Sequence, residues 1–369
     1  MSATPNTVQR IHNFSAGPAV LPLEVLEEAQ RDLVALPGVG MSVLEISHRS
    51  KAFEEVCSGA EEDFRRLGGI SDDHAVLFLQ GGATLQFAMV PMNLLPAGGT
   101  ADYIETGTWS TKAIADARRF GDVHVAASSK ATNHDRIPAQ AELRFSAAPA
   151  YVHMTSNNTI FGTQYHEVPD VPDGVPLVND ASSDIFCRPV DFSRFALTYA
   201  GGQKNLSIAG VTVVVVRRDL LERAPASVPA YLRYATHAKE RSLYNTPPVF
   251  GIYVLRLVLR RLLEGGGLEA VAVRNQRKTA KLYEAIDGSD GWYRGHAQPA
   301  SRSWMNVTFR LPDEALERKF VAEATAAGLD GLKGHRSVGG IRASIYNAFP
   351  EAGVDALIDF MTDFRRRSG

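Results

Sequence analysis

The chain has 369 residues, of which 45% are hydrophobic and 22% are charged, and its formal net charge at pH 7 is −2. These values exclude a disordered chain, a collagen and a small disulfide-stabilised scaffold, and the lack of a basic excess argues against a nucleic-acid partner. The polar start of the chain, residues 1–9, predicts no signal peptide, and no apolar run is long enough to cross a bilayer. Because two cysteines in this length suit a reducing compartment, we expect a cytoplasmic protein without membrane contact.

Two amphipathic helices are predicted near the start of the chain. Pro22 occupies a favourable first position for a helix over residues 22–36, in which apolar residues recur at helical spacing. Apolar residues at the same spacing between positions 53 and 67 predict a second helix, with Ser50 as its N-terminal cap.

From residue 75 onward, short apolar runs alternate with helical patterns. The runs cover residues 75–79, 101–105, 123–127, 150–154, 176–178, 195–199 and 211–216, and helical patterns cover residues 84–95 and 110–120. Strands that are apolar on both faces and alternate with helices predict an α/β fold with a mainly parallel, seven-stranded sheet. In such sheets, ligands bind at the carboxyl ends of the strands.

A second, smaller domain is predicted after three consecutive glycines at positions 265–267, which end a helix over residues 253–263. The later pattern predicts helices over residues 268–286, 314–327 and 354–367, strands over 305–310 and 341–345, and a glycine-rich loop over 331–340. We therefore predict a large cofactor-binding domain of residues 22–264. Residues 265–369, together with the N-terminal segment 1–21, form the predicted small α+β domain.

The first candidate site is the sequence Gly-Gly-Ala-Thr at residues 81–84, between a predicted strand and a predicted helix. Small residues there allow backbone N–H groups and the positive end of the helix to approach a phosphate. A tight strand-to-helix turn is an equally open interpretation. The start of a dinucleotide-binding fold is a third, although the glycine fingerprint of that fold is broken here.

A lysine and an aspartate form the second candidate site. Lys204 and Lys333 are the only two of the nine lysines in glycine-rich loops; the other seven, at positions 51, 112, 130, 239, 278, 281 and 319, fall in helical or polar stretches that we expect at the surface. Asp180 ends a predicted strand about one strand–loop–strand unit before Lys204, so we expect the two side chains to meet at one sheet edge. A desolvated lysine and a nearby acid are what a pyridoxal phosphate enzyme needs. A surface lysine and a capping aspartate remain the alternative.

Two His-Arg dipeptides, at residues 48–49 and 335–336, and Trp109 complete the candidates. Arginine forks bind carboxylate and phosphate groups, and an indole ring stacks on flat cofactors. Solvated surface cations and a core tryptophan are the alternative interpretations.

Several segments together resemble one known family over nearly the whole chain. They lie at residues 13–19, 45–49, 80–83, 91–95, 107–110, 200–205, 244–248 and 333–344. They resemble the phosphoserine aminotransferases, fold type I, class V enzymes that use pyridoxal 5′-phosphate. The resemblance implies homodimers with shared active sites and small-molecule substrates.

The resemblance also implies a role for each candidate. Lys204 would bind the cofactor covalently, Asp180 would pair with its ring nitrogen, and Trp109 would stack on its ring. The other implied cofactor contacts are Thr159 at the ring oxygen, Ala83, Thr84 and Gln203 at the phosphate, and Asn245 and Thr246 at that phosphate from the other subunit. Arg342 would bind the substrate α-carboxylate, and the distal phosphate or carboxylate would contact His48, Arg49, His335 and Arg336. Some members carry Arg where this chain has Thr84, so the anion-binding cluster has one cation fewer.

The implied reaction is reversible amino transfer between L-glutamate and 3-phosphohydroxypyruvate, which gives 2-oxoglutarate and O-phospho-L-serine. A further activity on 4-phosphohydroxy-L-threonine in vitamin B6 synthesis stays open. The alternatives are another class V aminotransferase, of the alanine–glyoxylate or serine–pyruvate type, and an NAD(P)-dependent dehydrogenase.

Overall fold

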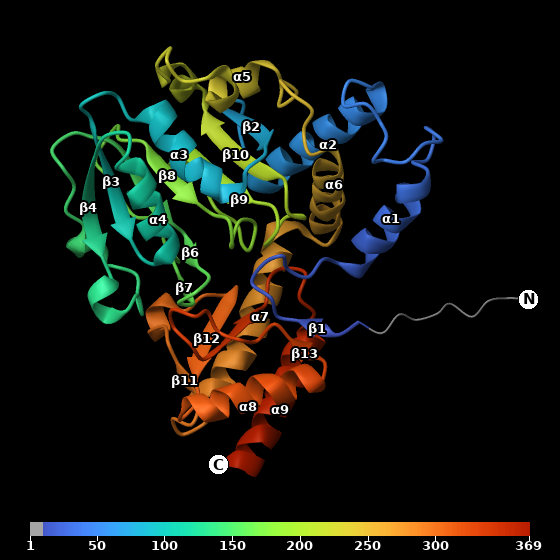
Figure 1. Cartoon of the computed structure of the whole chain (residues 1–369), viewed down its shortest axis with the longest axis vertical. Helices are drawn as coiled ribbons and strands as arrows, with labels where there is room; N and C mark the ends of the chain where they lie inside the picture. Colours follow the sequence, from blue (N-terminus) through green and yellow to red (C-terminus); the bar gives the residue numbers. More distant parts are fainter. Residues whose placement is uncertain (1–9) are drawn as a thin grey trace, which may run out of the picture.

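The computed structural model describes residues 10–369. Residues 1–9, and with them the prediction of no signal peptide and part of the predicted segment 1–21, lie outside the described residues. Figure 1 shows a large sheet with helices on both sides and, along the long axis, a second group of elements that follows α7 (Gly267–Asp287). The predicted α/β fold with a mainly parallel sheet of seven strands is confirmed.

The large sheet has the strand order β2-β10-β9-β8-β5-β3-β4. Its strands are β2 (His74–Leu79), β3 (Thr100–Glu105), β4 (Asp122–Ser128), β5 (Pro149–Thr155), β8 (Leu177–Asp180), β9 (Leu197–Gly201) and β10 (Thr212–Arg217). β10 runs antiparallel to both of its neighbours, and the other pairs are parallel. No helix separates β9 from β10, and such a short connection cannot make the crossover that a parallel pair requires.

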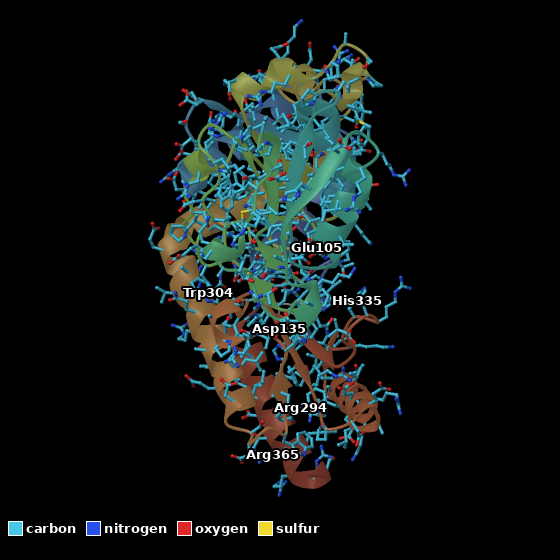
Figure 2. All side chains as sticks on the ribbon, turned by 90° about the vertical axis from the view of Figure 1, so that its left-hand side faces the viewer. Glu105, Asp135, Arg294, Trp304, His335 and Arg365 are labelled. Atoms are coloured by element: carbon cyan, nitrogen blue, oxygen red, sulfur yellow. The ribbon has the colours of Figure 1, made fainter. Side chains whose placement is uncertain are left out.

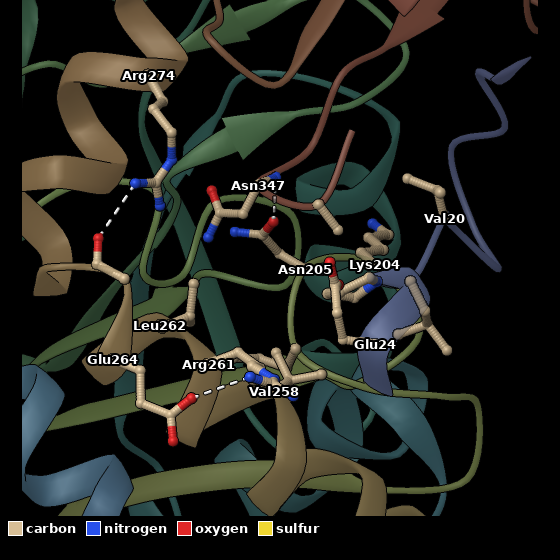
Figure 3. Close-up of a pocket in the computed structure, with 15 residues that line it drawn as sticks. Val20, Glu24, Lys204, Asn205, Val258, Arg261, Leu262, Glu264, Arg274 and Asn347 are labelled. Carbon is tan, nitrogen blue, oxygen red and sulfur yellow. Dashed lines mark hydrogen bonds and ion pairs between the residues drawn. The ribbon is translucent and has the colours of Figure 1, made fainter. Parts of the chain in front are cut away.

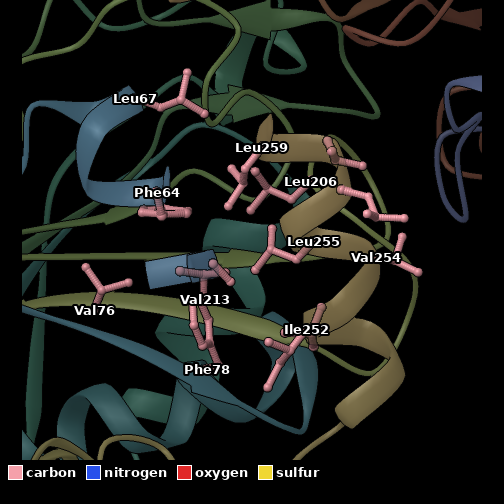
Figure 4. Packing of buried hydrophobic residues seen from close by; sticks show 14 of the residues in the cluster. Phe64, Leu67, Val76, Phe78, Leu206, Val213, Ile252, Val254, Leu255 and Leu259 are labelled. Atoms are coloured by element: carbon pink, nitrogen blue, oxygen red, sulfur yellow. The ribbon is translucent and has the colours of Figure 1, made fainter. Parts of the chain in front are cut away.

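Helices cover both faces of this sheet. They are α1 (Leu23–Val34), α2 (Lys51–Gly68), α3 (Gly82–Leu94), α4 (Thr108–Ala117), α5 (Tyr234–Lys239) and α6 (Val249–Glu264). One core joins α2 and α6 to one face, and Figure 4 shows Phe64, Ile252 and Leu255 packed over Val213 of β10. A second core joins α3 and α4 to the other face. The predicted cap of α2 is confirmed, because the Ser50 hydroxyl accepts a hydrogen bond from the Phe53 amide at 3.3 Å.

The C-terminal elements build a smaller antiparallel sheet, which α7, α8 (Glu314–Ala326) and α9 (Glu351–Ser368) accompany. The strands are β11 (Arg294–Gly295), β12 (Asn306–Arg310) and β14 (Ile341–Ser344), in that order. The N-terminal strand β1 (His12–Asn13) pairs with β13 (Leu329–Asp330), and Phe14 belongs to the C-terminal core. These contacts support the grouping of the N-terminal segment with residues 265–369, although the division into two domains stays a prediction.

The remaining elements are short. A hairpin joins β6 (Asn157–Asn158) to β7 (Thr163–Gln164), and 3-10 helices lie at Lys130–Thr132, Gln140–Glu142, Phe192–Arg194, Arg218–Arg223, Ala230–Leu232 and Pro299–Ser301. Between residues 10 and 369, no helix has both the length and the apolar character that a membrane span requires.

Candidate active site

A cavity of about 310 Å³ opens where β8 and β9 end, beside the N-termini of α3 and α4. This volume lies within the usual range of small-molecule sites, about 300–1,000 Å³. The predicted site residues that line the cavity are Ala83, Thr84, Trp109, Thr159, Asp180, Gln203, Lys204, His335 and Arg342. Segments that are far apart in the sequence therefore meet at one place.

The other predicted site residues do not line this cavity. They are His48, Arg49, Asn245, Thr246 and Arg336. Arg336 is exposed and lines a separate pocket beside α8. Arg49 and Thr246 are also exposed, so these side chains are accessible to a partner or a ligand from outside.

Lys204 follows β9 in a tight turn, in which the Gly202 carbonyl accepts a hydrogen bond from the Ser207 amide at 2.7 Å. Gly17 approaches it from the N-terminal segment, and a Cβ atom at Gly17 would lie 3.3 Å from Lys204 Cγ. The Lys204 amine makes no hydrogen bond or salt bridge to any residue between 10 and 369. Burial lowers the pKa of this amine, while the nearby Asp180 carboxylate acts in the opposite direction. The amine is thus accessible from the cavity and unpartnered.

Asp180 ends β8, directly opposite Tyr199 of β9 in the parallel register. Its Oδ1 atom accepts a hydrogen bond from the Ser182 amide at 3.0 Å. Burial raises the pKa of this carboxyl group, and the Lys204 ammonium, Ser182 and Tyr199 counteract that effect. A buried carboxylate with a cation beside it is the usual compensated arrangement.

A group of buried polar aromatic side chains next to Asp180 was not predicted from the sequence. The Tyr199 hydroxyl lies 2.9 Å from His153 Nε2, and Tyr103 stacks on the His153 ring with centroids 4.8 Å apart. Burial lowers the pKa of His153 to about 3, so the imidazole is neutral. The sequence does place polar aromatic residues on one face of the predicted strands. Only the strand register shows that Asp180 lies on the same face, beside Tyr199.

Trp109 lies in the first turn of α4 and forms one wall of the cavity. Its Nε1 atom donates a hydrogen bond to Thr159 Oγ1 at 2.9 Å, which fixes the plane of the indole ring. Lys204 Nζ lies 5.3 Å from the ring centroid. The tryptophan is therefore held beside the reactive amine.

The N-terminus of α3 meets the cavity through a glycine turn. Gly81 and Gly82 have φ angles of 88° and 65°, which L side chains rarely adopt. The first-turn amides of a helix have no partner within that helix, and Ala83, Thr84 and Gln203 line the cavity next to them. This corner offers donors to an anionic group.

Arg342 of β14 and His335 of the preceding loop close the cavity on the C-terminal side. Arg342 Nε is buried without a hydrogen-bond partner among the described residues, and burial lowers the pKa of the guanidinium. Burial, Arg342, Arg336 and Lys112 together lower the pKa of His335. Along the long axis in Figure 2, His335 lies between Glu105 of β3 and Arg294 of β11. An unpartnered buried guanidinium donor indicates a carboxylate site.

Lys204 also lines a larger cavity of about 540 Å³, together with Asn205, Arg261 and Arg274 (Figure 3). Two of its arginines already have partners, because Arg261 pairs with Glu264 at 3.2 Å and Arg274 donates to the Gly265 carbonyl at 3.3 Å. Asp180, Trp109 and Arg342 line only the smaller cavity. Within the described part of the chain, no group of three or more His, Cys, Asp or Glu side chains is placed to hold a metal ion. The smaller cavity is therefore the better candidate for chemistry.

Comparisons with known proteins agree with this geometry. The family model described as "Aminotransferase class-V" matches residues 11–357. A phosphoserine aminotransferase from Herpetosiphon aurantiacus is 56% identical to this chain over 97% of the chain and 99% of that protein. The structure of phosphoserine aminotransferase from Bacillus circulans subsp. alkalophilus is 51% identical, with a TM-score of 0.96 over 98% of this chain and 99% of that one.

A third similar protein was solved with PLP bound. It is the phosphoserine aminotransferase from Trichomonas vaginalis, 38% identical, with a TM-score of 0.91 over 96% of this chain and 100% of that one. The family match also rules out the alternative of an NAD(P)-dependent dehydrogenase, so residues 81–84 do not begin a dinucleotide-binding fold. The chain belongs to the class-V aminotransferases and, within them, to the phosphoserine aminotransferase family.

Proposed function

We propose that this protein uses pyridoxal 5′-phosphate to transfer the amino group of L-glutamate reversibly to 3-phosphohydroxypyruvate, which gives 2-oxoglutarate and O-phospho-L-serine. The observation that carries the proposal is the unpartnered Lys204 amine in the same cavity as the buried Asp180 carboxylate. We also propose a cytoplasmic location, which the composition and the two cysteines support.

The cavity fits this cofactor at each of its functional groups. Lys204 offers an amine to the aldehyde, and Asp180 offers a carboxylate to the ring nitrogen. The indole plane of Trp109, fixed by its hydrogen bond to Thr159, suits a flat ring, and the hydroxyl of Thr159 would contact a ring oxygen. Gln203 and the first turn of α3, with Ala83 and Thr84, suit the phosphate.

The bound cofactor supplies an electron sink that stabilises negative charge at the substrate Cα. Lys204 Nζ takes the Cα proton as a general base and returns it as a general acid, a task that a lowered amine pKa favours near neutral pH. Asp180 holds a proton on the ring nitrogen, and Tyr199 with His153 keeps that carboxylate in place.

The substrate anions match the cations around the cavity. Arg342, with its unpartnered Nε atom, binds the α-carboxylate. His335 and Arg336 donate hydrogen bonds to the distal phosphate or carboxylate. Because Arg336 is exposed, Arg336→Ala lowers kcat/KM about tenfold for O-phospho-L-serine and much less for L-serine. Steady-state kinetics measure the loss of kcat/KM for each amino donor. Equal losses for the two donors would mean that Arg336 does not bind the distal phosphate.

The active site is shared between the subunits of a homodimer. His48, Arg49, Asn245 and Thr246 lie outside the cavity of their own chain and bind at the partner's cavity. An exposed apolar surface between residues 23 and 44 supports an interface there: Leu23, Leu26, Leu33, Val34, Met41 and Leu44 are all exposed.

Subunit complementation tests this arrangement. Lys204→Ala and Arg49→Ala dimers are each inactive or weak, and unfolding and refolding a mixture of the two regenerates one intact site in each mixed dimer. Sedimentation equilibrium establishes the dimer, and the Lys204→Ala, Arg342→Ala mixture serves as the control, because both residues line one cavity. If the first mixture regains no activity, the site is not shared in this way.

The cofactor assignment is tested by colour and by chemical trapping. The purified protein absorbs visible light, L-glutamate shifts that band, and borohydride reduction followed by peptide mass analysis finds the cofactor on Lys204. Kinetics with O-phospho-L-serine, 4-phosphohydroxy-L-threonine and L-alanine then define the substrate class. Faster turnover of L-alanine with glyoxylate than of O-phospho-L-serine would contradict the proposed reaction.

A further inference from the structure

One lysine beside Trp109, a wall residue of the cavity, has no role in the site described so far. Lys112 lies on α4, one turn after Trp109, and its Nζ atom is 4.6 Å from the centroid of the indole ring. The same ring faces Lys204 Nζ at 5.3 Å and borders the cavity. Lys112 and Lys204 therefore both lie close to the same indole ring.

Lys112 has no acidic partner in the described structure. Asp116, one turn further along α4, is its partner by helical spacing, but Asp116 pairs with Arg119 at 3.6 Å. Between residues 10 and 369, no salt bridge includes Lys112. Lys112 is exposed, so water solvates its ammonium group and no side chain of the described structure neutralises it.

The charged groups that act on His335 are all cations. His335, on the loop that closes the cavity, experiences the positive charges of Arg342, Arg336 and Lys112, and each of them lowers the pKa of the imidazole. On the α3 side, Ala83 and Thr84 are uncharged, so they contribute no cation to the cavity. Positive charge is concentrated between α4 and the 335–342 segment, and an anionic group bound there relieves the mutual repulsion.

We propose that Lys112 is a specificity-determining residue that binds the distal phosphate of the substrate at the rim between α4 and His335. This inference rests on the proposed function, because it concerns the phosphorylated substrate of that same site. The dianionic phosphate of O-phospho-L-serine is the ligand that such a cluster favours over an uncharged side chain.

The test compares two amino donors in three holoenzyme variants. Lys112→Gln removes the charge and keeps a side chain of similar length, Lys112→Arg keeps the charge, and Lys239→Gln on α5 removes an exposed lysine elsewhere. We expect Lys112→Gln to lower kcat/KM about tenfold for O-phospho-L-serine and less than about twofold for L-serine. For Lys112→Arg and Lys239→Gln, we expect kcat/KM for both amino donors to stay close to the wild-type values.

A binding measurement separates this role from support of Trp109. Inorganic phosphate, titrated into the holoenzyme by calorimetry, binds more weakly to Lys112→Gln and with a smaller salt dependence. If Lys112 only packs on the indole ring, both donors lose activity equally and phosphate binding does not change, which overturns the inference. If the wild type shows no preference for O-phospho-L-serine over L-serine, the proposed function itself fails. If the wild type shows that preference and Lys112→Gln keeps it in full, only the role of Lys112 fails.

Discussion

Two lysines in two regions of the molecule have opposite surroundings. Lys204, at the end of β9 in the large sheet, lines a cavity and makes no hydrogen bond within residues 10–369. Lys278, in the middle of α7 against the C-terminal sheet, is only 3% exposed and donates to three backbone carbonyls, those of Ile345, Tyr346 and Phe349, at 2.7–3.2 Å. Burial lowers the pKa of both amines, to about 7 for Lys278.

The difference shows that desolvation alone does not mark a reactive amine. At Lys278, every ammonium hydrogen has an acceptor, so the side chain ties α7 to the chain that follows β14. At Lys204, the protein leaves the donor positions free and provides a cavity and a carboxylate instead. We therefore assign Lys278 to stability and Lys204 to chemistry.

The largest expected effect is that of Lys204→Ala. Loss of the general base lowers the rate of amino transfer by at least about 10³-fold, while the fold and non-covalent cofactor binding persist. Stopped assays for 2-oxoglutarate measure the rate, and the melting temperature monitors the fold. Turnover at the wild-type rate would show that another group does the proton transfer.

Asp180→Asn removes the charge that faces Lys204 and the ring nitrogen. We expect a loss of roughly 10²–10³-fold in kcat, typical of the removal of one charge-stabilising group, together with a changed visible spectrum of the bound cofactor. The matched control is Asp184→Asn, because Asp184 is also a buried carboxyl group but does not line the cavity. Equal effects of the two substitutions would mean that Asp180 acts only through packing.

Lys278→Met tests the structural half of the comparison. Three buried carbonyls lose their donor, so the free energy of unfolding falls by about 3 kcal/mol, while kcat/KM of the folded enzyme changes by less than the effect of Lys204→Ala. Denaturant titration measures the loss. The matched control is Lys281→Met one turn along α7, which breaks exposed ion pairs with Glu351 and Asp355 and costs about 1 kcal/mol or less.

The smallest effect is a difference in chemical labelling of the apo-protein. At about pH 8, the lowered pKa gives the amines of Lys204 and Lys278 a larger neutral fraction than an exposed lysine has. Only Lys204 is accessible from a cavity. A small acylating reagent, followed by peptide mass analysis, modifies Lys204 several-fold faster than exposed Lys239 and leaves Lys278 unmodified until the protein unfolds. Early modification of Lys278 would contradict its assignment as a buried structural group.

The spacing of apolar residues along the chain was enough to predict the architecture of the large sheet. The alternation of short apolar runs with helical periods predicts each strand of the large sheet within a few residues, because buried strands and amphipathic helices differ in the spacing of their apolar residues. The site around Lys204 follows in part, since Asp180 and Lys204 stand at the ends of consecutive parallel strands. The expectation that Lys278 lies at the surface is wrong, because a helical position does not show which neighbour will cover it.

The sequence by itself determined the fold class, the order of the elements and the pair of charged residues at one sheet edge, because each depends on spacing along a single stretch of chain. Only the tertiary structure decided which predicted residues share a cavity, that Tyr199 and His153 lie behind Asp180, and that Lys112 joins the cations near His335. Those relations arise where strands, helices and loops from distant parts of the chain pack together, and packing depends on the whole three-dimensional arrangement rather than on any local period.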